Sequence, residues 1–243
     1  LERVRQLYST LKKQRDELEF HHGRLQQEHE IAERVFSKIV QSEDFNTDGI
    51  RYMLSPLAIA NGDLVLAAKK PMGAGHVMLG DFTGHGLSAA LGAIPVSDIF
   101  YSMTAKGLPL TAVISEMNQK LRDKLPTGFF LAACLMEVDM EKGTVTIFNG
   151  GVPDVIVYGA DGSVKARITS GNLPLGVVST DQVGLALETV PVDEGDYVFI
   201  CSDGLIEAKN DAQELFSQER LDEYFNGSLP PAAVFDAIAE GLQ

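Results

Sequence analysis

The chain has 243 residues, 45% of them hydrophobic, which is enough apolar material for one core of ordinary domain size plus a modest additional element. Twenty Lys and Arg against 34 Asp and Glu give a net charge of −14, which argues against a surface for duplex nucleic acid. No run of about 18 apolar residues appears, and residues 1–13 are charged and amphipathic, so neither a membrane span nor a signal peptide is predicted. Cys134 and Cys201 lie in apolar strand-like runs, which favours buried reduced thiols and a cytoplasmic location over a disulfide.

Residues 1–40 have the composition of a long exposed helix, with no Pro, one Gly and many Glu, Gln, Lys, Arg and Leu residues. One apolar column recurs every seven residues, at Val4, Leu11, Leu18, Leu25, Ala32 and Ile39. The companion column is polar in its middle, at Gln14, His21 or His22, and His29. This pattern predicts a helical linker that pairs two copies of the chain as a coiled coil. The alternative is a single helix lying on its own domain.

Beyond residue 45 the pattern changes to short strand-like runs separated by turn residues. Strands are expected at residues 50–60, 63–69, 76–82, 130–139, 144–149, 155–158, 164–168, 184–190 and 197–202. Helices are expected from residue 87 with an interruption at Pro95, and over residues 109–124, 217–225 and 230–242. Consecutive strands with helices grouped in blocks indicate an α+β fold with antiparallel sheets.

Three pairs of Asp and Gly stand at the ends of apolar runs: Gly62-Asp63, Gly80-Asp81 and Asp203-Gly204. Taken singly, each pair is an ordinary turn signal. However, a carboxylate beside a buried strand is costly to desolvate without a positive partner, and no Lys or Arg adjoins these pairs. Oxygen ligands without His or Cys favour Mg²⁺ or Mn²⁺, so the three pairs together predict a divalent cation site.

Residues 80–91, GDFTGHGLSAAL, resemble the SpoIIE/RsbU-type branch of the metal-dependent PPM (type 2C) serine/threonine phosphatases, which read GD(V/F)xGHGxxAAL here. Further segments match the family's order over about residues 45–242. They are NGD at 61–63, KLPTGFFLAACLMEVD at 124–139, FNGGVPDVIVY at 148–158, GNLPLGV at 171–177 and VDEGDYVFICSDGLIEAKN at 192–210.

The resemblance implies a four-layer αββα sandwich of two antiparallel sheets, with residues 41–243 as the phosphatase domain. It also implies that Asp63, Asp81 and Asp203 bind two or more Mg²⁺ or Mn²⁺ ions and that the main-chain carbonyl of Phe82 completes one ion's shell. Catalysis would fall to Asp63, Asp81 and His85, with His85 donating to the substrate or leaving group. The alternative for His85 is a structural role in the following turn.

Two departures from the family pattern bear on metal binding. Leu66 occupies the position where the family usually has a second acid. The sequence also ends before the family's Asp-rich final strand, which we expect to be missing from this piece of a longer protein. Since Mg²⁺ affinity depends on the number of charged ligands, we expect weaker binding of at least one ion.

The resemblance implies a phosphoserine/phosphothreonine protein phosphatase in bacterial stress and sigma-factor signalling, acting on a phosphorylated anti-sigma factor antagonist. The chain is also similar to the effector half of RssB-type response regulators, so residues 1–40 are expected to join an upstream receiver or sensor domain. The alternative is a weakly active or inactive phosphatase-like adaptor that binds a sigma factor or regulatory protein. Nucleic acid and membrane are not expected partners.

Overall fold

The structure is a computed structural model that describes residues 2–40, 49–54, 62–71, 73–83, 87–179, 185–210 and 212–242. The helices are α1 (Glu2–Val40), α3 (Leu87–Ala105), α4 (Leu110–Lys124), α5 (Asp203–Ile206), α6 (Gln218–Glu223) and α7 (Pro231–Gly241). The strands are β1 (Asp63–Lys69), β2 (Gly75–Phe82), β3 (Leu131–Asp139), β4 (Thr144–Gly150), β5 (Val155–Tyr158), β6 (Val164–Ile168), β7 (Glu188–Pro191) and β8 (Tyr197–Phe199).

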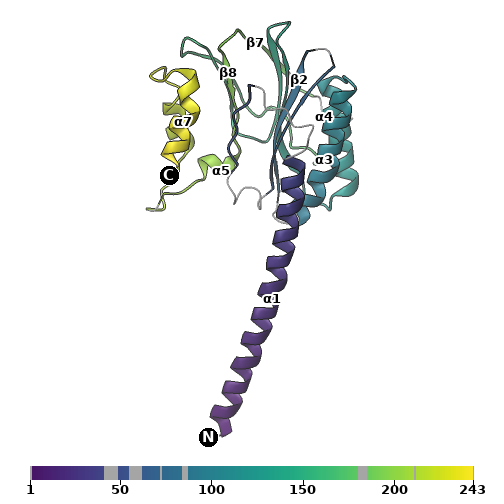
Figure 1. The fold of residues 1–243 in the computed structure, drawn as a ribbon, viewed down its shortest axis with the longest axis vertical. Helices are drawn as coiled ribbons and strands as arrows, with labels where there is room; N and C mark the ends of the chain where they lie inside the picture. The colour runs from purple at the N-terminus through teal and green to yellow at the C-terminus, as the bar shows by residue number, and fades with distance from the viewer. Residues whose placement is uncertain are drawn as a thin grey trace.

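The strands form two antiparallel sheets that face each other between two helical layers (Figure 1). The larger sheet has the order β1-β2-β3-β4-β7, and the smaller has the order β6-β5-β8. Helices α3 and α4 cover the outer face of the larger sheet, whereas α6 and α7 cover the smaller sheet. The predicted four-layer αββα sandwich is therefore confirmed.

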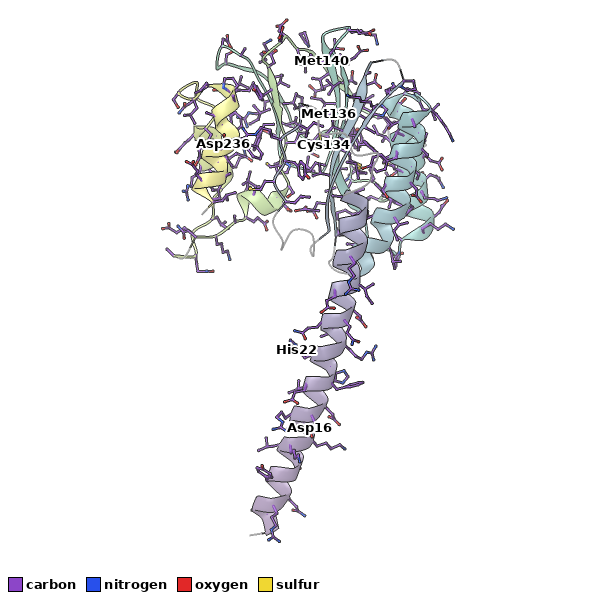
Figure 2. All side chains as sticks on the ribbon, in the orientation of Figure 1. Asp16, His22, Cys134, Met136, Met140 and Asp236 are labelled. Atoms are coloured by element: carbon purple, nitrogen blue, oxygen red, sulfur yellow. The ribbon has the colours of Figure 1, made fainter. Side chains whose placement is uncertain are left out.

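Three hydrophobic clusters hold these layers together, because strands such as β1, β3 and β5 bury side chains on both faces. The first joins α3 and α4 to the larger sheet and includes Leu66, Met78, Phe100, Met117 and Phe148. The second fills the space between the sheets and includes Cys134 and Met136, which are labelled in Figure 2. The third joins the smaller sheet to α6 and α7 and includes Ile156, Tyr158, Leu221 and Val234. Both cysteines are buried and unpaired, as expected.

Most predicted elements form within a few residues of their expected bounds, but three of the expected strands differ from the prediction. Residues 50–54 of the expected strand 50–60 have no strand structure, and residues 55–60 lie outside the described part of the chain. In the expected strand 184–190, residues 185–187 are irregular and β7 begins only at Glu188; residue 184 is not described. The strand expected over residues 197–202 is shorter than predicted. It forms as β8 and ends at Phe199, where its pairing with β5 stops.

The expected interruption at Pro95 is also wrong, since α3 continues through it. A proline within a helix removes the hydrogen bond to the carbonyl four residues earlier. That residue is Leu91, which is 60% exposed, so this turn of the helix is accessible to water. Ala93 and Val96, on either side of Pro95, are fully buried against the sheet. Packing of the two flanking turns therefore holds the helix across the missing bond.

Helix α1 is a single helix of 39 residues, as predicted for residues 1–40. Its C-terminal end lies beside α3 and β1, and the rest projects away from the sandwich, including Asp16 and His22 (Figures 1 and 2). Leu11, Leu18 and Leu25 are 57%, 69% and 64% exposed. The alternative of a helix lying along its own domain is therefore wrong for this stretch. Among the described residues, no helix is both long enough and apolar enough to cross a bilayer.

The segment that follows α1 is fastened to the opposite outer layer of the sandwich. Arg51 donates to the Ala232 carbonyl at 3.1 Å and to both carboxylate oxygens of Asp236, which is labelled on α7 in Figure 2. Its guanidinium also lies 4.7 Å from the centre of the Phe235 ring. Residues 49–54 thus attach the N-terminal part of the chain to its last helix.

A buried polar network ties β2 to β3 and α3. His76 is fully buried, with Nδ1 at 2.9 Å from Thr104 Oγ1 and Nε2 at 2.9 Å from Glu137 Oε2. Since a carboxylate only accepts, Nε2 carries the proton and Nδ1 accepts from the threonine hydroxyl. Lys70 Nζ donates to the same Glu137 oxygen at 2.8 Å. Burial is the main cause that lowers the pKa of His76, so the ring is neutral near pH 7.

Candidate metal centre

The fold brings together the three aspartates that the sequence singles out, which we call the aspartate cluster: Asp63, Asp81 and Asp203. Asp63 is the first residue of β1, and its register partner on β2 is Asp81. Asp203 is the first residue of α5 and forms a side-chain hydrogen bond with Asp81. Residues far apart in sequence therefore meet at one end of the sandwich.

The register shows which face of the larger sheet carries Asp63 and Asp81. Side chains alternate along a strand, so Asp63 shares a face with Val65, and Asp81 with Leu79. Leu79 packs in the cluster between the sheets and pairs with Cys134 on β3. The two carboxylates therefore lie on the inner face of the larger sheet, at the edge of the hydrophobic cluster between the two sheets.

Gly62 allows the chain before Asp63 to approach β2 closely. It has φ of +103°, and an added Cβ would lie 3.2 Å from the Phe82 carbonyl oxygen and 3.0 Å from Ala89 Cβ. The Phe82 amide donates to the Gly62 carbonyl at 3.4 Å. A larger residue would be strained here and would crowd the main chain of Phe82. The Phe82 carbonyl thus adjoins the turn that leads into the cluster, while its side chain is buried against the helices.

The two half-buried carboxyls hold their protons more tightly than usual. Burial is the main cause that raises the pKa of Asp63 to about 6; the charge of Asp203 adds to this, and a hydrogen bond from Ser202 opposes it. Burial is also the main cause that raises the pKa of Asp81 to about 7. The charges of Asp63 and Asp203, a hydrogen bond with Asp203 and the charge of Glu207 raise it further, in that order. All the charges that reach Asp81 are thus negative.

Ser202 and Glu207 belong to this site and were missed by the sequence analysis. Ser202 Oγ donates to Asp63 Oδ2 at 3.3 Å. Glu207 follows Asp203 by four residues, at the C-terminal end of α5, so the two acids share one side of a helical turn. That spacing was the available signal for Glu207. No signal in the sequence identifies the partner of Ser202, because Asp63 lies 139 positions away.

Leu66, where the family pattern has a second acid, does not face the aspartate cluster. It lies three residues after Asp63, so alternation places it on the other face of β1. There it is fully buried in the cluster with α3 and α4, opposite Met78. A carboxylate at this position would enter the hydrophobic core.

The side chains present fit a divalent cation in their chemistry. Among the described residues, no ion pair joins the three aspartates to a Lys or Arg, so the negative charge of the cluster is uncompensated. Also within the described ranges, no three His, Cys, Asp or Glu side chains stand in a ready-made arrangement around an ion. His85, the remaining predicted residue, lies outside the described residues.

The αββα sandwich is the fold of the PP2C domains among the solved structures that this chain resembles. The similarity to the SiaA-PP2C domain of Pseudomonas aeruginosa has a TM-score of 0.72 and 17% identity, over 91% of this chain and 90% of that one. For the RsbU and RsbW domains of Rv1364c from Mycobacterium tuberculosis, the TM-score is 0.63 with 21% identity over 77% of this chain. The chain spans about half of that structure, 52%.

A structure of RsbX in complex with magnesium is also similar, with a TM-score of 0.54 and 15% identity, over 74% of this chain and 78% of that one. At such identities these likenesses establish the fold. Residues 71–243 match the family model described as Stage II sporulation protein E, and the chain belongs to this SpoIIE family. No curated protein matches the sequence at a significant level.

Proposed function

We propose that this chain is a Mg²⁺- or Mn²⁺-dependent phosphatase of phosphoserine and phosphothreonine in proteins. The observation that carries the proposal is the convergence of Asp63, Asp81 and Asp203 at one end of the sandwich, with no Lys or Arg paired to them among the described residues. Membership of the SpoIIE family and the PP2C fold support a phosphatase.

In the proposed site, the three carboxylates and the Phe82 carbonyl would hold two or more ions. Bound Mg²⁺ or Mn²⁺ would supply an acidified water as nucleophile and would offset the negative charge of the phosphoryl group. The residues of the chain orient these ligands: the β1–β2 ladder sets Asp63 against Asp81, and α5 presents Asp203. We assign His85 a donor role toward the substrate.

The chain itself offers no strong thiol nucleophile beside the cluster. Burial raises the pKa of the Cys201 thiol to about 12, so this neighbour of Ser202 stays protonated at neutral pH. The Ser202 hydroxyl is engaged as a donor to Asp63. The protonated state of the Cys201 thiol supports direct attack by water over a covalent phosphocysteine.

For the substrate we propose a phosphorylated anti-sigma factor antagonist, in a bacterial partner-switching pathway that controls a sigma factor. The support is the SpoIIE family and the likeness to the RsbU and RsbW domains of Rv1364c. We further propose that α1 joins the domain to an upstream receiver or sensor and pairs with a second copy. The exposed column of Leu11, Leu18 and Leu25 supports this pairing. A cytoplasmic location is supported by the two unpaired buried cysteines.

Hydrolysis of a phosphoserine peptide, assayed with Mn²⁺, tests the enzymatic proposal. Asp81→Asn removes one carboxylate from the cluster, and Asp98→Asn removes one from an exposed position on α3 as a matched control. We expect turnover by the unmodified chain and Asp98→Asn, and a loss of at least 100-fold in Asp81→Asn. Equal rates in the two variants contradict the proposal. No turnover together with no Mn²⁺ binding favours a phosphatase-like adaptor, the function that the lack of a ready-made ion arrangement would fit.

A further inference from the structure

Ser202 makes an unusual use of its hydroxyl. It is the N-cap residue of α5, with the extended backbone typical of that position, yet its side chain makes no capping hydrogen bond. Serine is common at N-caps because its oxygen accepts from an amide of the first turn. Here the hydroxyl donates instead to Asp63 Oδ2, across 139 positions of sequence.

A second serine in the same chain makes the capping hydrogen bond that Ser202 lacks, although its backbone has a φ of +63°. Ser217 is the N-cap of α6, and its Oγ accepts from the Arg220 amide at 3.5 Å. Both serines stand at the start of short helices, but the acid that Ser202 contacts belongs to β1, whereas Glu219, the acid beside Ser217, belongs to α6 itself. The different use of the hydroxyl therefore follows from the position of Asp63.

The bond from Ser202 links the two ends of the aspartate cluster. Ser202 directly precedes Asp203, so its hydroxyl joins the segment that carries one acid to the side chain of another. Rotation of the Asp63 carboxylate would break this 3.3 Å hydrogen bond on Oδ2, and no hydrogen bond to Oδ1 is seen among the described residues. Outer hydrogen bonds of this kind orient metal-binding carboxylates, and losing one typically weakens metal affinity by 10- to 100-fold.

We propose that Ser202 is a positioning residue that fixes the Asp63 carboxylate relative to Asp203 and so pre-organises the cluster for a divalent cation. This inference rests on the proposed function, because it assigns Ser202 a role toward the ion that the cluster would hold. It assigns Ser202 the orientation of the Asp63 carboxylate and no part in the reaction itself.

The test is the Mn²⁺ dissociation constant, measured by calorimetry on the full chain and on three variants. Ser202→Ala removes the hydroxyl, Ser202→Thr keeps it, and Ser217→Ala removes the ordinary cap of α6. We expect about tenfold weaker Mn²⁺ binding for Ser202→Ala and less than twofold change for the other two variants. The free energy of unfolding, measured with urea in EDTA, is a second readout. It should fall in Ser217→Ala, because this variant loses the capping hydrogen bond of α6.

The outcomes separate this inference from the proposed function. If the full chain binds Mn²⁺ and Ser202→Ala binds it equally well, the positioning role is refuted and the metal site stands. If Ser202→Thr is as weak as Ser202→Ala, the hydroxyl is not the cause and the role is again refuted. If the full chain and Asp81→Asn both fail to bind, the proposed function fails. In that case, the free energies of unfolding of Ser202→Ala, Asp63→Asn and the double variant in EDTA give the coupling energy between the two side chains. A coupling energy of zero refutes the interaction of Ser202 with Asp63.

Discussion

In the absence of metal, replacing Asp81 by Asn should stabilise the folded chain at neutral pH. The folded carboxyl has a pKa of about 7, against 3.8 as its ordinary value, so the folded state binds this proton more tightly than the unfolded state. The free energy of unfolding therefore falls as the pH rises from about 4 through 7. Asn cannot ionise and escapes this loss, whereas it keeps the size of the protonated side chain.

The size of the effect follows from the same pKa values. The full difference between 3.8 and about 7 corresponds to about 4 kcal/mol at about 1.4 kcal/mol per pH unit. Asp81 is only half-buried and shares its field with neighbouring acids, so solvent screening reduces the expected gain to about 2 kcal/mol at pH 8. At pH 5 the gain should be smaller, because the difference in free energy grows with each pH unit above 3.8 and pH 5 lies only about one unit above that value.

Urea unfolding of the full chain in EDTA, followed by circular dichroism between pH 5 and 8, measures this difference. Asp98→Asn is the control, because it removes an exposed carboxylate on α3. Saturating Mn²⁺ should invert the order, since an ion at 100 times its dissociation constant stabilises the unmodified chain by about 2.7 kcal/mol. If Asp81→Asn is no more stable than the unmodified chain at pH 8 in EDTA, the acids are not crowded as described.

Three further predictions concern other parts of the molecule. Leu66→Ala should lower the free energy of unfolding by about 3 kcal/mol while the Mn²⁺ dissociation constant stays unchanged; a change in affinity would show that position 66 faces the cluster. Because burial lowers the pKa of His76 below 6.5, its stabilising contribution is present above pH 6.5 and is lost as the pH falls. His76→Gln should therefore flatten the stability profile below pH 6.5, and an unaltered slope would contradict the buried neutral ring. Leu18→Glu should convert dimers into monomers in light scattering, whereas Phe20→Glu, equally exposed but outside the apolar column, should not; a monomeric unmodified chain would refute the pairing.

The sequence was sufficient for the elements whose pattern is local. The heptad spacing predicted α1, and the helix expected over residues 109–124 forms as α4, with Val113, Met117 and Leu121 on its buried face. The three aspartates were found because each stands next to a glycine at the end of an apolar run. Their convergence depends on strand pairing, and the family resemblance supplied it where periodicity did not.

What the sequence could not predict depends on distant partners. The β1–β2 register sets Asp63 opposite Asp81, and a shift by one residue would move one of them to the other face. Pro95 breaks a local rule, and only packing of α3 against the sheet shows why the helix continues. Residues 50–54 have strand-like composition but are held through Arg51 on α7.

The attachment of Arg51 to α7 has a consequence for synthesis of the protein. Asp236 is 185 positions after Arg51, so these two side chains cannot pair on a ribosome-bound chain until α7 has emerged. Contacts of such long separation are slow to form, since the entropy of loop closure opposes them. A nascent chain that has not reached α5 also lacks Asp203. Phosphatase activity, on the function proposed above, would therefore appear only after both α5 and α7 have been translated.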